Sequence, residues 1–262
     1  MVEFVRNICF KLLDSTLLPH INIGLLHGQE LQRLKECCAS MGLMVEGDYG
    51  PLSKRVQPQK QFFRRMAHLR AAGELKIPFT TGILLGMGET PGDRITSLEA
   101  VASIQGRYGH VQEVILQNYV PPGPSFPRPV PIPLDEMEEL VAFVRQEMPG
   151  VHIQFPPNLN SHWIELLNMG FDDLGGMSVD EDAVNPNRPW PVIDDLEKSL
   201  VTAGFQLNRR LPLYPEFHNP DWQSACVGQV VRDIVAHRRG YGHYHTACME
   251  EKGSVSQHQT SA

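Results

Sequence analysis

A glycine-rich turn after an apolar run is the part of this sequence best suited to bind a ligand. Residues 77–90 (IPFTTGILLGMGET) begin with β-favouring and apolar residues and end in a glycine cluster that contains Glu89. Such a run is typical of a strand buried on both faces, as in a parallel sheet. Glycines at its end let a ligand approach the backbone, because no Cβ stands in the way. Ordinary turn chemistry is the alternative, since the third glycine of a dinucleotide fingerprint is missing.

Polar residues or glycines also stand at the ends of the neighbouring predicted strands. These strand ends carry His20 and Asn22, Glu46, Gly86 and Glu89, Gln117 and Asn118, Asn158, and Ser178. In a barrel of alternating strands and helices the C-terminal strand ends share one rim, and that rim forms the site. A single polar strand end is as well explained by a loop residue, but several in register predict one binding site at the rim.

The elements that must position this rim alternate between strand and helix about six times. Helices are predicted over residues 2–16, 29–41, 62–73, 94–108, 134–148, 161–169 and 190–203, with short apolar strands between them. This alternation predicts an α/β fold with a parallel sheet of about six strands. Residues 1–217 are expected to form the compact part. Residues 218–262 are expected to form a helix, over 222–239, and a disordered polar tail.

Composition excludes several classes of function. The chain has 262 residues, 42% hydrophobic and 20% charged, with a net charge of −7, so it offers no basic surface for nucleic acid or an anionic membrane. No apolar run is long enough to span a bilayer, and the cytoplasm is the expected compartment, with an import signal ahead of residue 1 left open. The five cysteines lack CxxC spacing, and a site built from His237, His243, His245 and Cys248 is a weaker reading than a disordered tail, so no metal site is predicted.

Eight segments, taken in order, resemble one enzyme family. They are residues 17–24 (LLPHINIG), 39–46 (ASMGLMVE), 71–90 (AAGELKIPFTTGILLGMGET), 111–118 (VQEVILQN), 156–159 (PPNL), 172–178 (DDLGGMS), 184–191 (VNPNRPWP) and 210–217 (RLPLYPEF). As a set they resemble the radical S-adenosylmethionine (SAM) subunit of deazaflavin synthase, which makes 7,8-didemethyl-8-hydroxy-5-deazariboflavin.

The resemblance implies a partial radical SAM (β/α) TIM-like barrel with SAM and a [4Fe-4S] cluster as cofactors. Such an enzyme is a lyase that abstracts hydrogen from a hydroxybenzyl–ribitylaminouracil adduct, after which the ring closes with loss of ammonia. Its partners would be this small-molecule substrate and the second radical SAM subunit that makes the adduct. The protein would bind and orient these molecules and exclude water.

The resemblance also implies roles for particular residues. Glu46, Arg65, Gly82, Leu84, Gly86 and Glu89 would bind SAM, with the planar guanidinium of Arg65 suited to the SAM carboxylate. His20, Asn22, Gln117, Asn118 and Asn158 would line the substrate side. No catalytic residue is assigned.

The sequence departs from the family in two places. Nothing matches the CxxxCxxC cluster motif, and the resemblance begins at the family's third strand, so the chain is not expected to ligate the cluster or to cleave SAM by itself. After Asn118 the family carries Phe-Arg and a lysine, where this chain has Tyr119-Val120-Pro121-Pro122. Three interpretations stay open: part of a longer active enzyme, an inactive barrel remnant that binds a ligand or partner, or a barrel completed by a second polypeptide. An open sheet edge predicts self-association.

Overall fold

The computed structural model describes residues 1–50, 61–121, 123, 126–178, 182 and 185–237, and the backbone of 246–251. The parallel part of the sheet contains β1 (His20–Ile21), β2 (Ser40–Gly42), β3 (Phe79–Leu85), β4 (Val111–Asn118), β5 (His152–Gln154) and β6 (Asp173–Gly176), in that order. The antiparallel strands β8 (Thr246–Glu251) and β7 (Phe205–Arg209) extend the sheet beyond β6. The six parallel strands confirm the predicted α/β fold.

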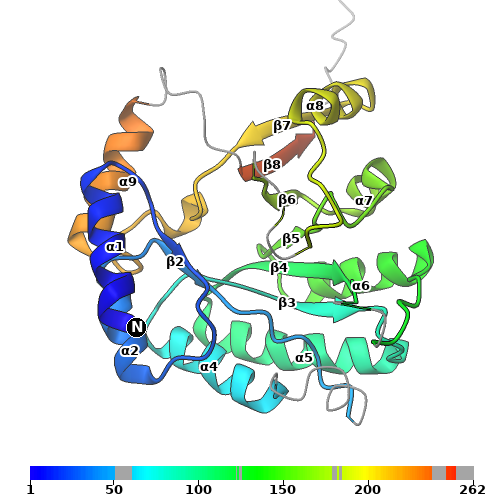
Figure 1. Ribbon diagram of the computed structural model, residues 1–262, viewed down its shortest axis with the longest axis horizontal. Helices are drawn as coiled ribbons and strands as arrows, with labels where there is room; N and C mark the ends of the chain where they lie inside the picture. The colour runs from blue at the N-terminus through cyan, green and yellow to red at the C-terminus, as the bar shows by residue number, and fades with distance from the viewer. Residues whose placement is uncertain are drawn as a thin grey trace, which may run out of the picture.

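Helices alternate with these strands as the sequence predicted. They are α1 (Val2–Asp14), α2 (Gly28–Lys35), α4 (Phe62–Glu74), α5 (Pro91–Tyr108), α6 (Leu134–Glu147), α7 (Trp163–Met169), α8 (Ile193–Thr202) and α9 (Ala225–His237), with the short 3-10 helix η1 (Pro215–Phe217) before α9. Figure 1 shows a curled sheet with α4 and α5 along one face of β3 and β4, and with α1 and α9 near the end where these strands begin. Within the described residues, no helix combines the length and apolar character that a membrane span requires.

The central strands form because their residues are apolar on both faces. Every residue of β3 is buried, and Ile83, Val114, Ile153 and Leu174 are fully inaccessible to solvent. Burial on both faces is the reason that parallel strands lack an alternating polar pattern. These side chains pack against helices such as α5, which holds the strands in the register that brings their C-terminal ends together.

The helix after the glycine turn begins where its sequence provides a cap. The Thr90 side chain accepts a hydrogen bond from the Asp93 N–H (3.2 Å), and the Asp93 carboxylate accepts one from the Thr90 N–H (2.8 Å). Pro91 occupies the first helical turn, where its missing N–H costs nothing. Gly109 ends the helix in the left-handed conformation (φ 64°). Helix α5 therefore starts directly behind the turn.

A buried ionic network closes the end at which the strands begin. Arg210 donates to Glu113 on β4 (2.9 Å) and to Asp173 on β6, and Tyr214 also donates to Asp173. The carbonyl of Pro212 accepts from Ser40 at the start of β2. Burial raises the pKa of Glu113 to about 7, although the charge of Arg210 opposes this shift. The segment 210–214 thus fills the N-terminal mouth of the half-barrel.

The C-terminal part differs from its expectation in one segment. Helix α9 lies within the predicted helix 222–239. Residues Thr246–Glu251, within the tail expected to be disordered, form β8 between β6 and β7. Without β8, the facing edges of β6 and β7 would carry unpaired backbone groups, and any extended segment can satisfy such groups whatever the polarity of its side chains. Residues 238–245 and 252–262, which include His243 and His245, lie outside the described residues.

Candidate functional site

The strand register places most of the predicted site residues at one edge of the sheet. Glu46 bridges to Ile83 on β3, next to Leu84, which lies opposite Gln117 on β4. Leu85 lies opposite Asn118, and Gly86 follows it at the glycine turn. Because the strands are parallel, these positions belong to the C-terminal rim. In Figure 1 this is the side to which the arrowheads of β3 and β4 point.

The glycine turn is held by Glu89. Its two carboxylate oxygens accept hydrogen bonds from the N–H groups of Gly86 and Met87, each at 2.7 Å. Arg94 on α5 donates to the same carboxylate (2.8 Å) and also to Glu136 on α6. Although burial disfavours the charged form, these hydrogen bonds raise the pKa of Arg94. The carboxylate of Glu89 therefore has partners within the protein, and its hydrogen bonds hold the glycine turn in shape.

The glycines serve local packing and backbone conformation. A Cβ at Gly82 would lie 2.1 Å from the carbonyl oxygen of Ile115 on the adjacent strand. Gly86 has φ +91°, in the region that favours glycine, and a Cβ there would lie 2.5 Å from the carbonyl oxygen of Val130. Close approach of the chain to itself requires glycine at both positions in the structure.

Glu46 and Arg65 form a buried pair at the rim. Glu46 is 6% exposed and has φ +72°, a conformation that is uncommon for a residue other than glycine and that is often found at functional sites. The Arg65 Nη1 atom lies 3.7 Å from a Glu46 carboxylate oxygen and donates to the carbonyl of Met44. Burial lowers the pKa of Arg65, and the charge of Glu46 opposes the shift. The sequence did not reveal the strained backbone at Glu46.

Asparagine side chains connect the ends of β4, β5 and β6. Asn118 donates through Nδ2 to the side-chain oxygen of Asn160 (2.7 Å), and Asn160 donates to the carbonyl of Pro156 (3.0 Å). Asn158 donates through Nδ2 to Asp182 (2.7 Å) and to the carbonyl of Arg188 (3.0 Å). The partners of Asn118 and Asn158 are oxygen atoms that accept hydrogen bonds, so the NH₂ group of each side chain must face them. The amide oxygens of Asn118 and Asn158 therefore point away from this network.

Five buried polar atoms around this rim have no hydrogen-bond partner among the described residues. They are Arg65 Nε, Asn118 Oδ1, Tyr119 OH, Asn158 Oδ1 and Trp190 Nε1. Buried polar groups are nearly always paired, so a group of unpaired donors and acceptors in one region calls for an explanation. Sequence reasoning missed Tyr119 and Trp190, along with the supporting residues Arg94, Asn160 and Asp182. The spacing of Asn158 and Asn160 is the one signal that could have suggested an asparagine network.

Two predicted substrate residues lie away from this rim. His20 is the first residue of β1, and its Nδ1 is 2.7 Å from the Ser40 hydroxyl, which donates to Pro212. In the register of the sheet, Asn22 comes level with Gly42 on β2 and Thr80 on β3. Thr80 precedes Leu84 by four residues, so Asn22 lies about 13 Å below the level of the rim at the usual rise of a strand. Strand β1 is shorter than the sequence suggested, so His20 stands nearer the N-terminal mouth than a strand-end residue would.

The residues present fit SAM better than they fit an iron–sulfur cluster. The unpaired Arg65 Nε is a buried donor of the kind that a carboxylate needs. Cys9 on α1, and Cys37 and Cys38 just after α2, are buried, and burial raises the pKa of Cys38. No group of three metal-ligating side chains occurs in the described part of the chain. The described residues therefore provide no ligand set for a cluster.

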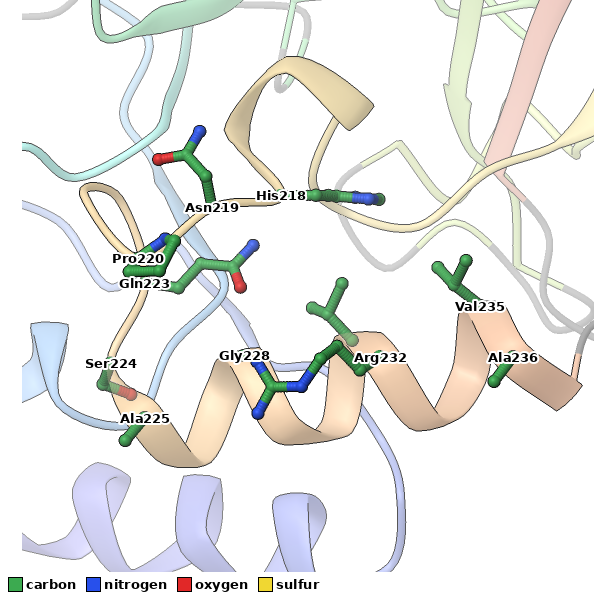
Figure 2. A pocket seen from close by; sticks show the side chains of 11 residues that line it. His218, Asn219, Pro220, Gln223, Ser224, Ala225, Gly228, Arg232, Val235 and Ala236 are labelled. Atoms are coloured by element: carbon green, nitrogen blue, oxygen red, sulfur yellow. The ribbon is translucent and has the colours of Figure 1, made fainter.

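A groove along α9 is a separate hollow in the described structure. Its volume is about 990 Å³, and it is lined by residues of α9 and of the preceding loop, including His218, Asn219, Gln223 and Arg232 (Figure 2). Helix α9 lies near the end of the sheet where the strands begin (Figure 1). None of the predicted site residues lines this groove, so the rim and the groove are distinct candidates.

Comparison with solved structures concerns the fold. Methylornithine synthase (PylB) matches with a TM-score of 0.58 and 20% identity, over 79% of this chain and 63% of that chain. The hydrogenase maturase HydG from Carboxydothermus hydrogenoformans matches with a TM-score of 0.54 and 20% identity, over 65% and 43%. These likenesses confirm the predicted fold, a partial (β/α) TIM-like barrel. No protein-family model matches the chain.

Comparison with curated sequences is more specific. The chain is 42% identical over 247 residues to 7,8-didemethyl-8-hydroxy-5-deazariboflavin synthase of Methanopyrus kandleri. This alignment covers 89% of this chain and 72% of the relative. The synthase of Methanothermobacter thermautotrophicus is 42% identical over 241 residues, covering 89% and 74%. That of Archaeoglobus fulgidus is 42% identical over 234 residues, covering 88% and 72%. The chain belongs to the 7,8-didemethyl-8-hydroxy-5-deazariboflavin synthase family.

Proposed function

We propose that the C-terminal rim binds SAM and a hydroxybenzyl–ribitylaminouracil adduct, and that the chain takes part as a lyase in closing the deazaflavin ring with loss of ammonia. The observation that carries this proposal is the group of unpaired buried polar atoms at the rim of a chain that belongs to the deazaflavin synthase family. When bound, SAM would supply the group that abstracts hydrogen.

On the cofactor side, Arg65 would pair with the carboxylate of SAM through its unpaired Nε, and Glu46 would face the cofactor's amino group or ribose. Leu84 would form part of the apolar surface under the adenine. Glu89 would act indirectly, since it holds the N–H groups of Gly86 and Met87 in the turn. Gly82 and Gly86 would keep the strand and turn in the shape that this site needs.

On the substrate side, Asn118 and Asn158 would accept hydrogen bonds through their fixed amide oxygens. A uracil ring offers N–H donors and a ribityl chain offers hydroxyl donors, so the substrate matches the polarity that these side chains present. Gln117, opposite Leu84, would lie between the two ligands. His20 and Asn22 would touch only a part of the substrate that extends down into the half-barrel.

A second candidate function follows from the described cysteines. Because they provide no ligand set for a cluster, the described part would bind the ligands or a partner chain without cleaving SAM. The second radical SAM subunit, which makes the adduct, is the partner that this reading favours. Both candidates share the binding site at the rim, so its test comes first.

The rim site predicts that the chain binds the reaction product. The deazaflavin is fluorescent, so its quenching or polarisation reports binding directly. Asn158→Ala is expected to weaken binding at least tenfold, because a buried hydrogen bond to the ligand is lost while Asp182 keeps Asn185 as a partner. The matched control is Asn219→Ala in the α9 groove. Loss of binding in the control alone, or no binding by the unaltered chain, would contradict the proposal.

A further inference from the structure

We propose that Tyr119 is an additional ligand-binding residue whose hydroxyl hydrogen-bonds the adenine ring of the nucleoside at the glycine turn. This inference rests on the proposed function, since it takes the adenosyl cofactor to lie at that turn. Tyr119 follows β4 directly, and its N–H donates to the carbonyl of Leu85 (2.7 Å), one residue before Gly86. The residue is therefore anchored beside the turn.

Tyr119 belongs to a small cluster at the rim, which is separate from the main core. Its members are Tyr49, Leu84, Met87 and Tyr119, all at most 5% exposed. Two aromatic rings, a branched aliphatic side chain and a polarisable thioether make a surface that suits a flat heteroaromatic base. Leu84 and Met87 come from either side of Gly86, so this surface borders the turn.

The backbone of the turn has little polarity left to recognise such a base. The carbonyl of Leu84 accepts from Tyr49 OH (2.7 Å), that of Leu85 from Tyr119 N–H (2.7 Å) and that of Gly86 from Val130 N–H (2.8 Å), while the N–H groups of Gly86 and Met87 donate to Glu89. Each of these backbone groups already has a partner. The N–H groups of Gly86 and Met87 are therefore not available as donors, and a side chain at the cluster is the better candidate to donate a hydrogen bond to a ligand.

The two tyrosines of the cluster differ in the hydrogen bonding of their hydroxyl groups. The hydroxyl of Tyr49 is satisfied by Leu84, whereas that of Tyr119 is buried and has no partner. An unpaired buried hydroxyl destabilises the ligand-free chain, and phenylalanine would fill the same space without that cost. Burial raises the pKa of Tyr119, so the hydroxyl keeps its proton at neutral pH and can donate to a ring nitrogen of adenine.

Tyr119→Phe in the full chain tests the inference, with 5′-deoxyadenosine and SAM as the probes in isothermal titration calorimetry. We expect affinity for both probes to fall about tenfold, because one hydrogen bond to the base is lost. The melting temperature of the ligand-free variant is expected to stay the same or rise, because an unpaired polar group is removed. This pair of opposite effects separates ligand binding from a structural role.

Two further variants provide the comparison. Tyr49→Phe is expected to lower the melting temperature of the ligand-free chain, because the carbonyl of Leu84 loses its donor. Tyr108 is the last residue of α5, far from the glycine turn, and its exposed hydroxyl donates to Glu74 on α4. The affinity of the Tyr108→Phe variant for both probes should therefore match that of the unaltered chain.

Two results would overturn the inference while leaving the proposed function intact. One is an affinity of Tyr119→Phe within twofold of the unaltered chain. The other is a fall in its melting temperature as large as that of Tyr49→Phe, which would reveal an internal partner for the hydroxyl. If the unaltered chain binds neither probe, the proposed SAM site fails and the inference fails with it, while deazaflavin binding still reports on the substrate side.

Discussion

Arg210→Met is expected to lower the free energy of unfolding by about 3–5 kcal/mol, the usual cost of removing one partner from a buried ion pair. Arg210 is the cation between Glu113 and Asp173, and the side chains of all three are less than 10% exposed. Methionine would keep most of the packing but leave two buried carboxylates without their cation. The segment 210–214, which fills the N-terminal mouth, would lose its main attachment to β4 and β6.

Chemical denaturation measures this effect, with Arg33→Met as the matched control. Arg33 pairs with Glu3 at 3.2 Å, but both side chains are more than 60% exposed, so its loss should cost no more than about 1 kcal/mol. If Arg210→Met does not fold, Tyr214→Phe gives a milder change, since it removes only a hydroxyl that donates to Asp173 and, more weakly, to Glu113 (3.5 Å). Equal stabilities of Arg210→Met and Arg33→Met would show that the network contributes nothing to the fold.

Acid is expected to destabilise the fold through two buried histidines. His68 is 5% exposed and accepts a hydrogen bond from the N–H of Leu26 (3.1 Å), and the inaccessible His110 donates to the carbonyl of Leu69 (2.9 Å). Burial lowers the pKa of each to about 4, from 6.5. A lowered pKa in the folded state gives stability that is present above pH 6.5 and is lost as the pH falls towards 4. Each histidine should therefore cost about 2 kcal/mol at pH 5, at about 1.4 kcal/mol per pH unit.

The double variant His68→Asn, His110→Gln isolates this effect. Asparagine offers an oxygen near the position of Nδ1, and glutamine offers an N–H near the position of Nε2, so the hydrogen bonds can be kept while the titration is removed. Glu113 acts in the opposite direction. Because its pKa is raised in the folded state, the fold loses stability as the pH rises from 4.5 to 7. Glu113 is unchanged in both proteins, so it cancels in their difference. Parallel plots of unfolding free energy against pH between 7.5 and 5 would contradict the prediction.

The sequence was sufficient to predict those parts of the fold that local patterns determine. The apolar runs of β3 and β4 predicted buried parallel strands, and the threonine and proline at positions 90 and 91 mark the start of α5. The polar ends of these strands predicted the rim. All of these features depend on residues that are close together in the chain.

Features that depend on distant contacts could not be predicted from the sequence. Arg210 meets Glu113 across 97 positions, and Asn118 meets Asn160 across 42, so no local pattern marks either pair. The contacts of Glu89 with Arg94 and with the N–H groups of the turn likewise could not be predicted from the sequence, which suggested only that Glu89 faces a cofactor. The unpaired hydroxyl of Tyr119 is visible only once its neighbours are placed.

Hydrogen–deuterium exchange of the full chain, measured with and without the deazaflavin product, distinguishes ligand binding at the strand ends from binding in the groove along α9. We expect slower exchange in residues 86–90, 117–119 and 156–160 when the deazaflavin is bound. Slower exchange confined to residues 218–236, which line the groove, would contradict this expectation.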